Sequence, residues 1–430
     1  MRITQVSTND ISGGAARAAY RLHTGLRKLG HDSRMLVAHK ASEDANVALF
    51  QPSRDLPSRV RRRALSSLIS RSWSRLPPRP PGATFFSDDR SSFGAEMVEQ
   101  LPPCDILQLH WISSFVDYRK FFSRIPRNLP IVWTLHDMNP FTGGCHYSGD
   151  CGRFRVSCGA CPELLSAVPE DFSAQSWRRK QQALSYRDER GVQIVTPSRW
   201  LAEQARTSSL FANMQMEVIP NGVDTEKFQP RDRRSARESY GIPPEAKVVL
   251  FVADWASEKR KGSDLLLAAA QGMISEQELY FVTIGRGSPL KSLGQHAKAI
   301  DYVRDDVALS SIYSAANVFV LPSLQDNLPN TALEALACGV PIVAFAAGGL
   351  PDIVRDGETG VLAPPGDVGA LRAAITKVLQ DPHRQAAMGE SCRRTALAEY
   401  KLDVQAKRYM TLYESLLPAG ADSAKPASAR

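Results

Sequence analysis

Short apolar runs, each long enough for one buried strand, alternate with segments of helical periodicity along most of the chain. A strand at Arg2 to Ser7 is followed by a glycine turn and then by a helix from Ala15 to Leu29, which Gly30 closes. Further strands of the first half are predicted at Ser33 to Ala38, Ile106 to Leu109, Ile131 to Leu135 and Gln193 to Thr196. Strands that alternate with helices form parallel sheets covered on both faces, so this half is predicted to be one doubly wound domain.

A second series of alternating elements begins after a turn that Pro220 and Gly222 mark. It predicts strands at Val248 to Ala253, Tyr280 to Ile284 and Val318 to Leu321, with helices at Ser263 to Gln271, near Ala308 to Ala315 and after residue 330. A chain of 430 residues also exceeds the roughly 100 to 200 residues usual for one domain. We therefore predict an α/β protein with two Rossmann-like, doubly wound domains, 1–215 and 216–394.

Apolar runs of about 20 residues, the length that spans a bilayer, do not occur in the sequence. The first residues, MRITQVSTND, also lack the apolar region of a secretion signal, so we expect a cytosolic protein. The formal charge of +8 is concentrated in residues 54–81, which hold eight arginines and the single acid Asp55. Anionic lipid, a diphosphate or nucleic acid would bind such a segment, and the alternative is a solvated insertion.

Two acids flank the predicted start of the helix that follows the strand Val318 to Leu321. Asp326 lies in the loop after that strand, and Glu334 lies in the first turns of the helix. In open α/β sheets, ligands bind beyond the carboxyl ends of the strands, where helix amino termini present N–H groups to anions. We therefore expect Asp326 and Glu334 to border a bound ligand.

Basic residues stand at the corresponding place after the strand Val248 to Ala253. Arg260 and Lys261 follow this strand and precede a helix, so we predict that they bind a diphosphate. The alternative is a solvated basic loop. No convincing Asp-x-Asp metal signature accompanies them.

The first domain offers a histidine and a glycine turn at its own strand ends. His136 follows the strand Ile131 to Leu135, which places an imidazole at the cleft for hydrogen bonding and orientation. Gly13 and Gly14 form the first strand-to-helix turn, where glycine lets a diphosphate approach the backbone, although turns also use glycine for steric reasons alone.

The segment from Leu321 to Asp367 resembles the Glu-x7-Glu signature of the family-4 retaining glycosyltransferases (group 1), including its Ala-Cys-Gly-Val-Pro-Ile-Val and Gly-Gly-Leu-Pro-Asp-Ile-Val stretches. Asp326 stands where the family usually has glutamate, one methylene longer, and Glu334 matches the acid that holds the donor ribose. The Asp-Asn-Leu-Pro-Asn around Asp326 is similar to a subgroup that acts in surface-polysaccharide assembly, such as exopolysaccharide or O-antigen biosynthesis. The resemblance implies the GT-B fold, in which the two domains face each other across a cleft, and a nucleotide-sugar donor.

Other residues gain a role only through this resemblance. Lys261-Gly262 is similar to the family's Lys-Gly, whereas Trp255 stands near the place of its usual arginine, so Arg260 is expected to replace that arginine. The resemblance implies that His136 contacts the donor sugar and that Gly13, Gly14 and Asn221 contact the donor. It also implies that a final helix, about Thr395 to Leu416 (395–417), packs back on the first domain, and residues 418–430 have the composition of a disordered tail.

Four cysteines, Cys145, Cys151, Cys158 and Cys161, lie within residues 145–161. Four thiolates hold one zinc tetrahedrally, and Cys158-x2-Cys161 is a good ligand pair, whereas Cys145-x5-Cys151 is loose for a standard ribbon. A structural zinc, an iron-sulfur site, disulfides and unconnected thiols are the alternatives. In each case we expect a structural role beside the acceptor side of the cleft.

Together these features predict a retaining glycosyltransferase that requires no cofactor for catalysis. It would move a hexose-like sugar from a nucleoside-diphosphate sugar to a saccharide acceptor, lipid-linked and destined for a cell-surface polysaccharide. The arginine segment would contact the cytoplasmic face of the inner membrane, and nucleic acid is not an expected partner. The alternatives are a nucleotide-sugar epimerase or phosphorylase of the same fold, and a non-catalytic protein that binds zinc or nucleic acid.

Overall fold

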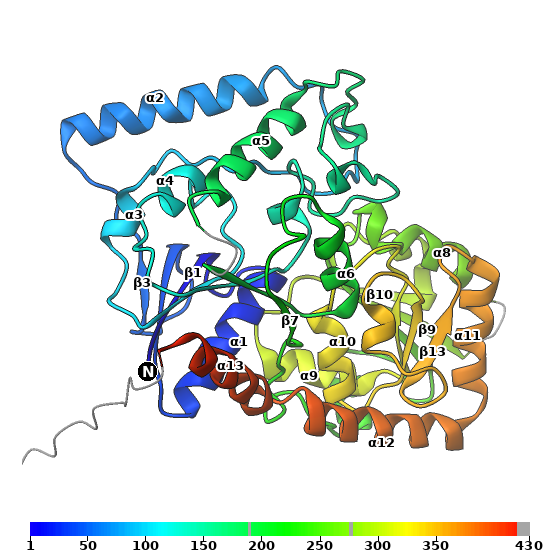
Figure 1. Cartoon of the computed structure of the whole chain (residues 1–430). Helices are drawn as coiled ribbons and strands as arrows, with labels where there is room; N and C mark the ends of the chain where they lie inside the picture. Colours follow the sequence, from blue (N-terminus) through cyan, green and yellow to red (C-terminus); the bar gives the residue numbers. More distant parts are fainter. Residues whose placement is uncertain (188–190, 275–277, 419–430) are drawn as a thin grey trace, which may run out of the picture.

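The computed structural model describes residues 1–187, 191–274 and 278–418, and it contains two parallel sheets, each covered by helices (Figure 1). The first sheet has the order β3-β2-β1-β4-β5-β6-β7, and the second has the order β10-β9-β8-β11-β12-β13. Neighbouring strands pair in parallel, as helical crossovers require. The prediction of an α/β fold with two Rossmann-like domains is confirmed.

The first sheet consists of β1 (Arg2–Asn9), β2 (Asp32–His39), β3 (Val47–Leu49), β4 (Ile106–Leu109), β5 (Ile131–Thr134), β6 (Val192–Thr196) and β7 (Met216–Val218). Its helices are α1 (Gly14–Lys28), α2 (Leu56–Trp73), α3 (Glu96–Glu99), α4 (Tyr118–Phe122), α5 (Phe172–Leu184) and α6 (Arg199–Thr207). Because β7 pairs with β6, the boundary predicted after residue 215 falls one strand too early.

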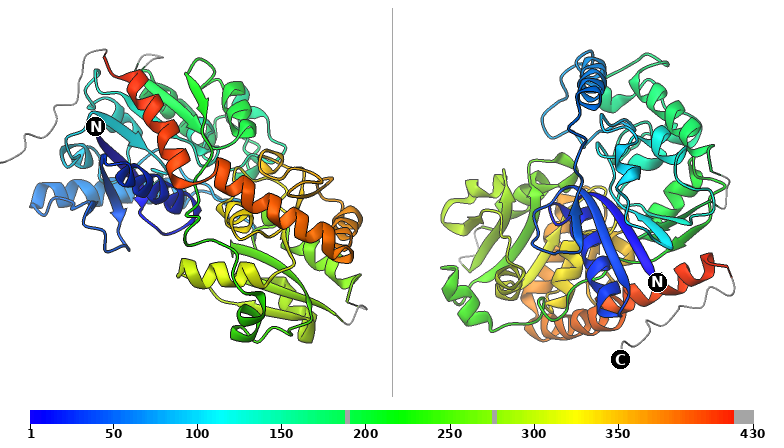
Figure 2. Two further views of the ribbon diagram at one scale, coloured as in Figure 1. Left: turned by 90° about the horizontal axis from the view of Figure 1, so that it is seen from below. Right: turned by 90° about the vertical axis from the view of Figure 1, so that its left-hand side faces the viewer.

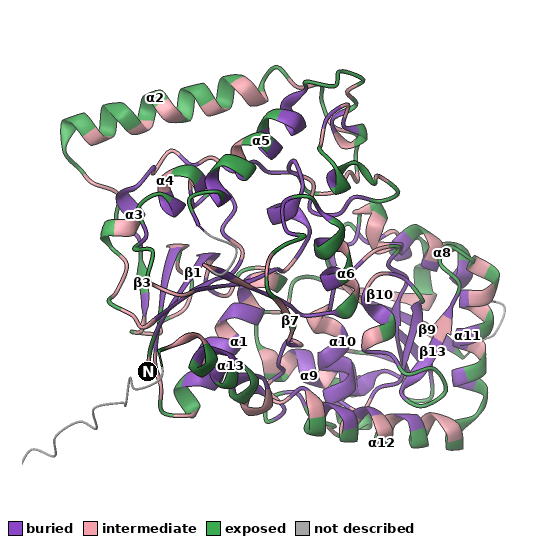
Figure 3. Ribbon diagram, viewed as in Figure 1, coloured by how far each residue is buried: buried purple, intermediate pink, exposed green. Residues whose placement is uncertain are grey.

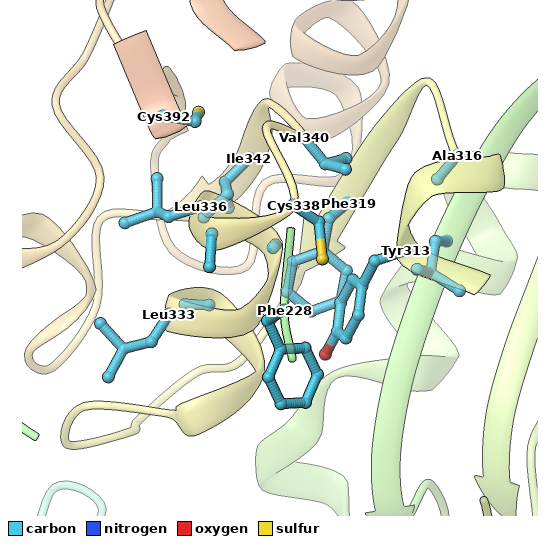
Figure 4. Packing of buried hydrophobic residues seen from close by; sticks show 14 of the residues in the cluster. Phe228, Tyr313, Ala316, Phe319, Leu333, Leu336, Cys338, Val340, Ile342 and Cys392 are labelled. Atoms are coloured by element: carbon cyan, nitrogen blue, oxygen red, sulfur yellow. The ribbon is translucent and has the colours of Figure 1, made fainter. Parts of the chain in front are cut away.

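The second sheet consists of β8 (Lys247–Trp255), β9 (Leu279–Arg286), β10 (Ala297–Ile300), β11 (Val318–Leu321), β12 (Ile342–Phe345) and β13 (Gly360–Ala363). Its helices are α7 (Arg233–Ser239), α8 (Ser263–Gln271), α9 (Asp306–Ala315), α10 (Asn330–Ala337), α11 (Val368–Gln380) and α12 (Pro382–Glu399). Figure 4 shows the core on one face of this sheet, where Phe228, Tyr313 and Phe319 pack beside α10. This packing fixes α10, which carries Glu334, against the sheet.

The predicted final helix is in fact two helices. α12 ends at Glu399, Tyr400 and Lys401 lie outside the helices, and α13 (Leu402–Leu416) starts in a new direction (Figure 2). The segment that returns to the first domain therefore begins near Leu402 instead of Thr395. Its Tyr409 and Tyr413 are buried in a cluster with residues of α1 and β1. The predicted disordered tail lies outside the described residues from position 419 onward.

Helix α2 forms most of the arginine-rich segment and projects from the first domain with no buried residue (Figure 3). Asp55 caps its amino terminus by accepting a hydrogen bond from the Ser58 N–H. Trp73 anchors the other end, because its ring packs against Phe86 and Phe172. None of the helices in the described ranges is long and apolar enough to cross a membrane.

Candidate active site

A cavity of about 340 Å³ lies between the two domains at the carboxyl ends of their strands. The predicted site residues that line it are Gly14, His136, Asn221, Arg260, Lys261, Asp326 and Glu334. Gly13 is not in the lining: it caps α1 with a φ of 89°, a conformation that favours glycine. The Asn221 amide lies against the backbone oxygen of Leu328 at 3.4 Å, which ties the interdomain connection to the loop before α10.

Strand order explains why the predicted cations meet the predicted acid. β8 and β11 are neighbours in the second sheet, so the turn after β8 and the loop after β11 leave the same edge side by side. The Leu324 N–H donates to the Arg260 carbonyl at 2.8 Å and joins the two loops. Gly262 has a φ of 68°, and a Cβ there would stand 1.8 Å from the Pro322 carbonyl oxygen, so only glycine allows this approach.

Asp326 is the centre of a buried charge cluster. Its carboxylate lies 2.7 Å from Lys261 Nζ and 3.5 Å from an Arg260 nitrogen, and Arg260 also pairs with Glu258 at 2.9 Å. Burial by itself would raise the pKa of Asp326, but Lys261 and Arg260 outweigh it and hold the pKa at about 2. Asp326 is therefore ionised at neutral pH, and both cations lie at the wall of the cavity.

Glu334 lies in α10 and binds partners that the sequence did not indicate. Its carboxylate accepts a hydrogen bond from Arg21 at 2.6 Å and another from the Tyr313 hydroxyl at 3.1 Å, and all three side chains are buried. Arg21 belongs to α1 of the first domain, so this ion pair joins the two domains. Arg17, one turn earlier, pairs with Asp306 at 3.3 Å. The i, i+4 spacing of Arg17 and Arg21 places both arginines on one face of α1.

His136 lies at the end of β5, as predicted, and its imidazole contacts a second histidine. Its Nε2 is 3.1 Å from His110 Nδ1, and His110 Nε2 in turn is 2.8 Å from Gln5 Oε1. Burial lowers the pKa of His136 to about 4, although Asp137 opposes this effect, and burial also lowers the pKa of His110 well below its usual value. Both rings are therefore neutral at pH 7 and form a hydrogen-bonded chain at the cleft.

The lowered pKa values of His110 and His136 predict that the fold is less stable in acid. An unfolded histidine binds a proton near pH 6.5, whereas His136 does so only near pH 4, and burial also holds the pKa of His110 well below its usual value. Between these values the unfolded state binds more protons, so the free energy of unfolding should fall as the pH falls from about 6.5 to 4. Urea unfolding at pH 7.5 and 5 measures this, and His110→Gln should reduce the difference. An equal free energy at both pH values would contradict the assignment.

The four clustered cysteines border one small cavity next to Phe86 and Phe154. All four are free thiols, and burial raises the pKa of Cys158 to about 12. Cys158 Sγ accepts a hydrogen bond from the Gly143 N–H at 3.0 Å. In the described part of the chain, no three His, Cys, Asp or Glu side chains are arranged to hold a metal ion. The described residues thus hold no preformed ligand set for zinc, and the structural zinc stays a prediction.

Two Rossmann-like domains with cations and acids at the cleft are the architecture of a GT-B glycosyltransferase. The family model described as Glycosyltransferase Family 4 matches residues 12–227, and the model described as Glycosyl transferases group 1 matches residues 246–381. The chain therefore belongs to the family-4 glycosyltransferases.

Curated relatives carry the name D-inositol 3-phosphate glycosyltransferase. The protein of Kribbella flavida is 34% identical over 70% of this chain and 69% of its own length. The protein named D-inositol 3-phosphate glycosyltransferase 2 from Catenulispora acidiphila is 35% identical, but the match spans only 41% of this chain and 45% of that relative.

Solved structures share the fold at low sequence identity. Sucrose-phosphate synthase of Thermosynechococcus elongatus superposes with a TM-score of 0.67 at 19% identity, over 97% of this chain and 99% of the other. HepE of Anabaena, solved with UDP, gives a TM-score of 0.64 at 16% identity, over 96% of this chain and 100% of that one. At these identities the likeness supports the fold alone.

Proposed function

We propose that the protein is a retaining glycosyltransferase that moves a sugar from a nucleoside-diphosphate sugar to a saccharide acceptor. The observation that carries the proposal is the pair Arg260 and Lys261 at the wall of the interdomain cavity that Glu334 also lines. Two adjacent cations suit a diphosphate that gains negative charge as it leaves the sugar. Glu334, at the base of α10, would accept hydrogen bonds from the ribose hydroxyls.

The charge of the cleft favours a neutral saccharide over a phosphorylated acceptor. The first domain contributes His136, Asp137 and Tyr147 to the cavity, and its lining cation Arg17 is already paired with Asp306. A neutral imidazole and a carboxylate both form hydrogen bonds with hydroxyl groups. The carboxylate repels phosphate, and the neutral imidazole offers phosphate no positive charge. The names of the relatives make inositol phosphate the second candidate acceptor, so both classes belong in an activity screen.

We further propose that helix α2 brings the enzyme to the cytoplasmic face of an anionic membrane, where a lipid-linked saccharide for a cell-surface polysaccharide would be found. Its exposed arginines Arg59, Arg63 and Arg71 supply positive charge, and Leu56, at 70% exposure, offers an apolar contact. Each basic residue near an anionic surface contributes roughly 1 kcal/mol.

Replacement of Arg59, Arg63 and Arg71 by glutamine should therefore weaken binding to vesicles with 30% phosphatidylglycerol by about 100-fold. Sedimentation with vesicles at low salt measures the binding. The matched control replaces three exposed cations of other elements, Arg127, Arg234 and Lys377. Equal losses in both triple variants, or binding that does not depend on salt, would refute a specific role of α2.

A thermal-shift screen against UDP-, GDP- and ADP-sugars tests the donor site without a known acceptor. A ligand that binds only the folded state at 100 times its Kd adds about 2.7 kcal/mol of stability, which raises Tm by several degrees. We expect one nucleotide to give this shift selectively and Lys261→Met to abolish it. No shift with any donor would refute the proposed donor class.

A further inference from the structure

Residues 145–161 form the cysteine-rich loop of the first domain, and this loop reaches the cations of the second domain. Tyr147, which lies in this loop, is buried at 8% exposure and lines the interdomain cavity. Two residues further on, the Gly149 N–H donates to the Gln325 side chain at 3.0 Å. The loop thus contacts the segment next to Asp326 at two points.

Tyr147 contacts both partners of the charge cluster. The Arg260 guanidinium carbon lies 4.0 Å from the centre of the Tyr147 ring, and the Tyr147 hydroxyl donates to Asp326 at 3.3 Å. Trp200 stacks on the ring at 6.3 Å between centroids and an interplanar angle of 13°. The ring of Tyr147 therefore covers one face of the Arg260 guanidinium, whose N–H groups also donate to Glu258 and to the Gln325 carbonyl, and its hydroxyl is one of the partners of Asp326.

The loop itself is held firmly at this place. The His146 N–H donates to the Phe85 carbonyl at 3.1 Å, and the His146 carbonyl accepts from the Met138 N–H at 2.9 Å. The His146 ring lies between Asp137 at 2.6 Å and Ser87 at 2.8 Å, and its neighbours are buried. The backbone next to Tyr147 is therefore held in place. A side chain on such a backbone can hold Arg260 in one position.

We propose that Tyr147 is a positioning residue, supplied by the first domain, that orients Arg260 for the donor diphosphate when the two domains are closed. This proposal rests on the proposed donor site. The attraction between a cation and an aromatic face is strongest when the cation is desolvated. A guanidinium that lies against a ring presents its N–H groups in one fixed direction. Because Tyr147 and Arg260 come from different domains, this orientation exists only in the closed arrangement, and diphosphate binding is coupled to closure.

Isothermal titration with UDP and UMP, or with the corresponding pair for the nucleotide that the donor screen selects, tests this role. Tyr147→Leu removes the aromatic face at similar volume, so Kd for the diphosphate should rise about tenfold and Kd for the monophosphate should stay within about twofold. Tyr147→Phe keeps the face and loses only the hydroxyl, so it should restore most of the diphosphate affinity. Tyr147→Met serves as a second non-aromatic variant should the leucine variant fold poorly.

The outcomes separate positioning from packing. Equal losses of UDP and UMP affinity would overturn the proposal, because a structural defect weakens the binding of both nucleotides. Unchanged UDP affinity in both non-aromatic variants would also overturn it. If Tyr147→Phe were as weak as Tyr147→Leu, the hydroxyl and not the ring would be the important group, and the proposal would be wrong. A wild-type protein that binds no nucleoside diphosphate would instead refute the donor site, and this inference would fall with it.

Discussion

Glu334→Gln is expected to lower kcat/KM for the sugar donor by about 100-fold to 1000-fold. A carboxylate that accepts two ribose hydroxyls gains roughly 1.5–3 kcal/mol from each hydrogen bond, and an amide accepts them less well. Steady-state kinetics across a range of donor concentrations measures this loss. Normal turnover in the variant would contradict the assignment of Glu334.

The same substitution should also destabilise the protein, because it leaves Arg21 buried without its 2.6 Å partner. Removing one partner of a buried ion pair costs about 3–5 kcal/mol. The double variant Arg21→Met with Glu334→Gln removes both charges, so it should recover much of the stability but none of the donor affinity. If the double variant regained donor use as well, the loss in the single variant would be a folding effect.

Lys261→Met has the second largest expected effect, a decrease in kcat of about 100-fold to 1000-fold. The ammonium lies 2.7 Å from Asp326 and would turn to the leaving diphosphate when the donor binds. Its neighbour Lys259 is exposed in the same short turn and makes no ion pair within the described residues. Lys259→Met is therefore the matched control and should retain nearly full activity. Equal losses in the two variants would show that only the general positive charge of the turn matters.

The sequence predicted the parts of the fold that depend on local patterns. The apolar run Val318 to Leu321 is a buried strand with the predicted bounds, and the helix Ser263 to Gln271 also has its predicted ends. The break at Tyr400 and Lys401 was missed, because the periodicity of α12 continues into α13 without a proline or glycine there.

Contacts between the domains could not be predicted from spacing along the chain. Arg21 and Glu334 are 313 positions apart, and Tyr147 and Asp326 are 179 apart. Such pairs depend on how two sheets face each other, which one sequence does not encode in a local pattern. The predicted cations Arg260 and Lys261 did meet Asp326, because all three follow strand ends and strand ends share one edge of a parallel sheet.

Proton NMR of one donor reaction shows whether the protein transfers a sugar with retention. The reaction contains the nucleotide sugar that the binding screen selects and a panel of saccharide acceptors together with inositol phosphate. We expect release of the nucleoside diphosphate and a new glycoside whose anomeric coupling matches that of the donor. A product with inverted configuration would contradict the retaining mechanism, and an unchanged donor with every acceptor would contradict the claim of glycosyl transfer.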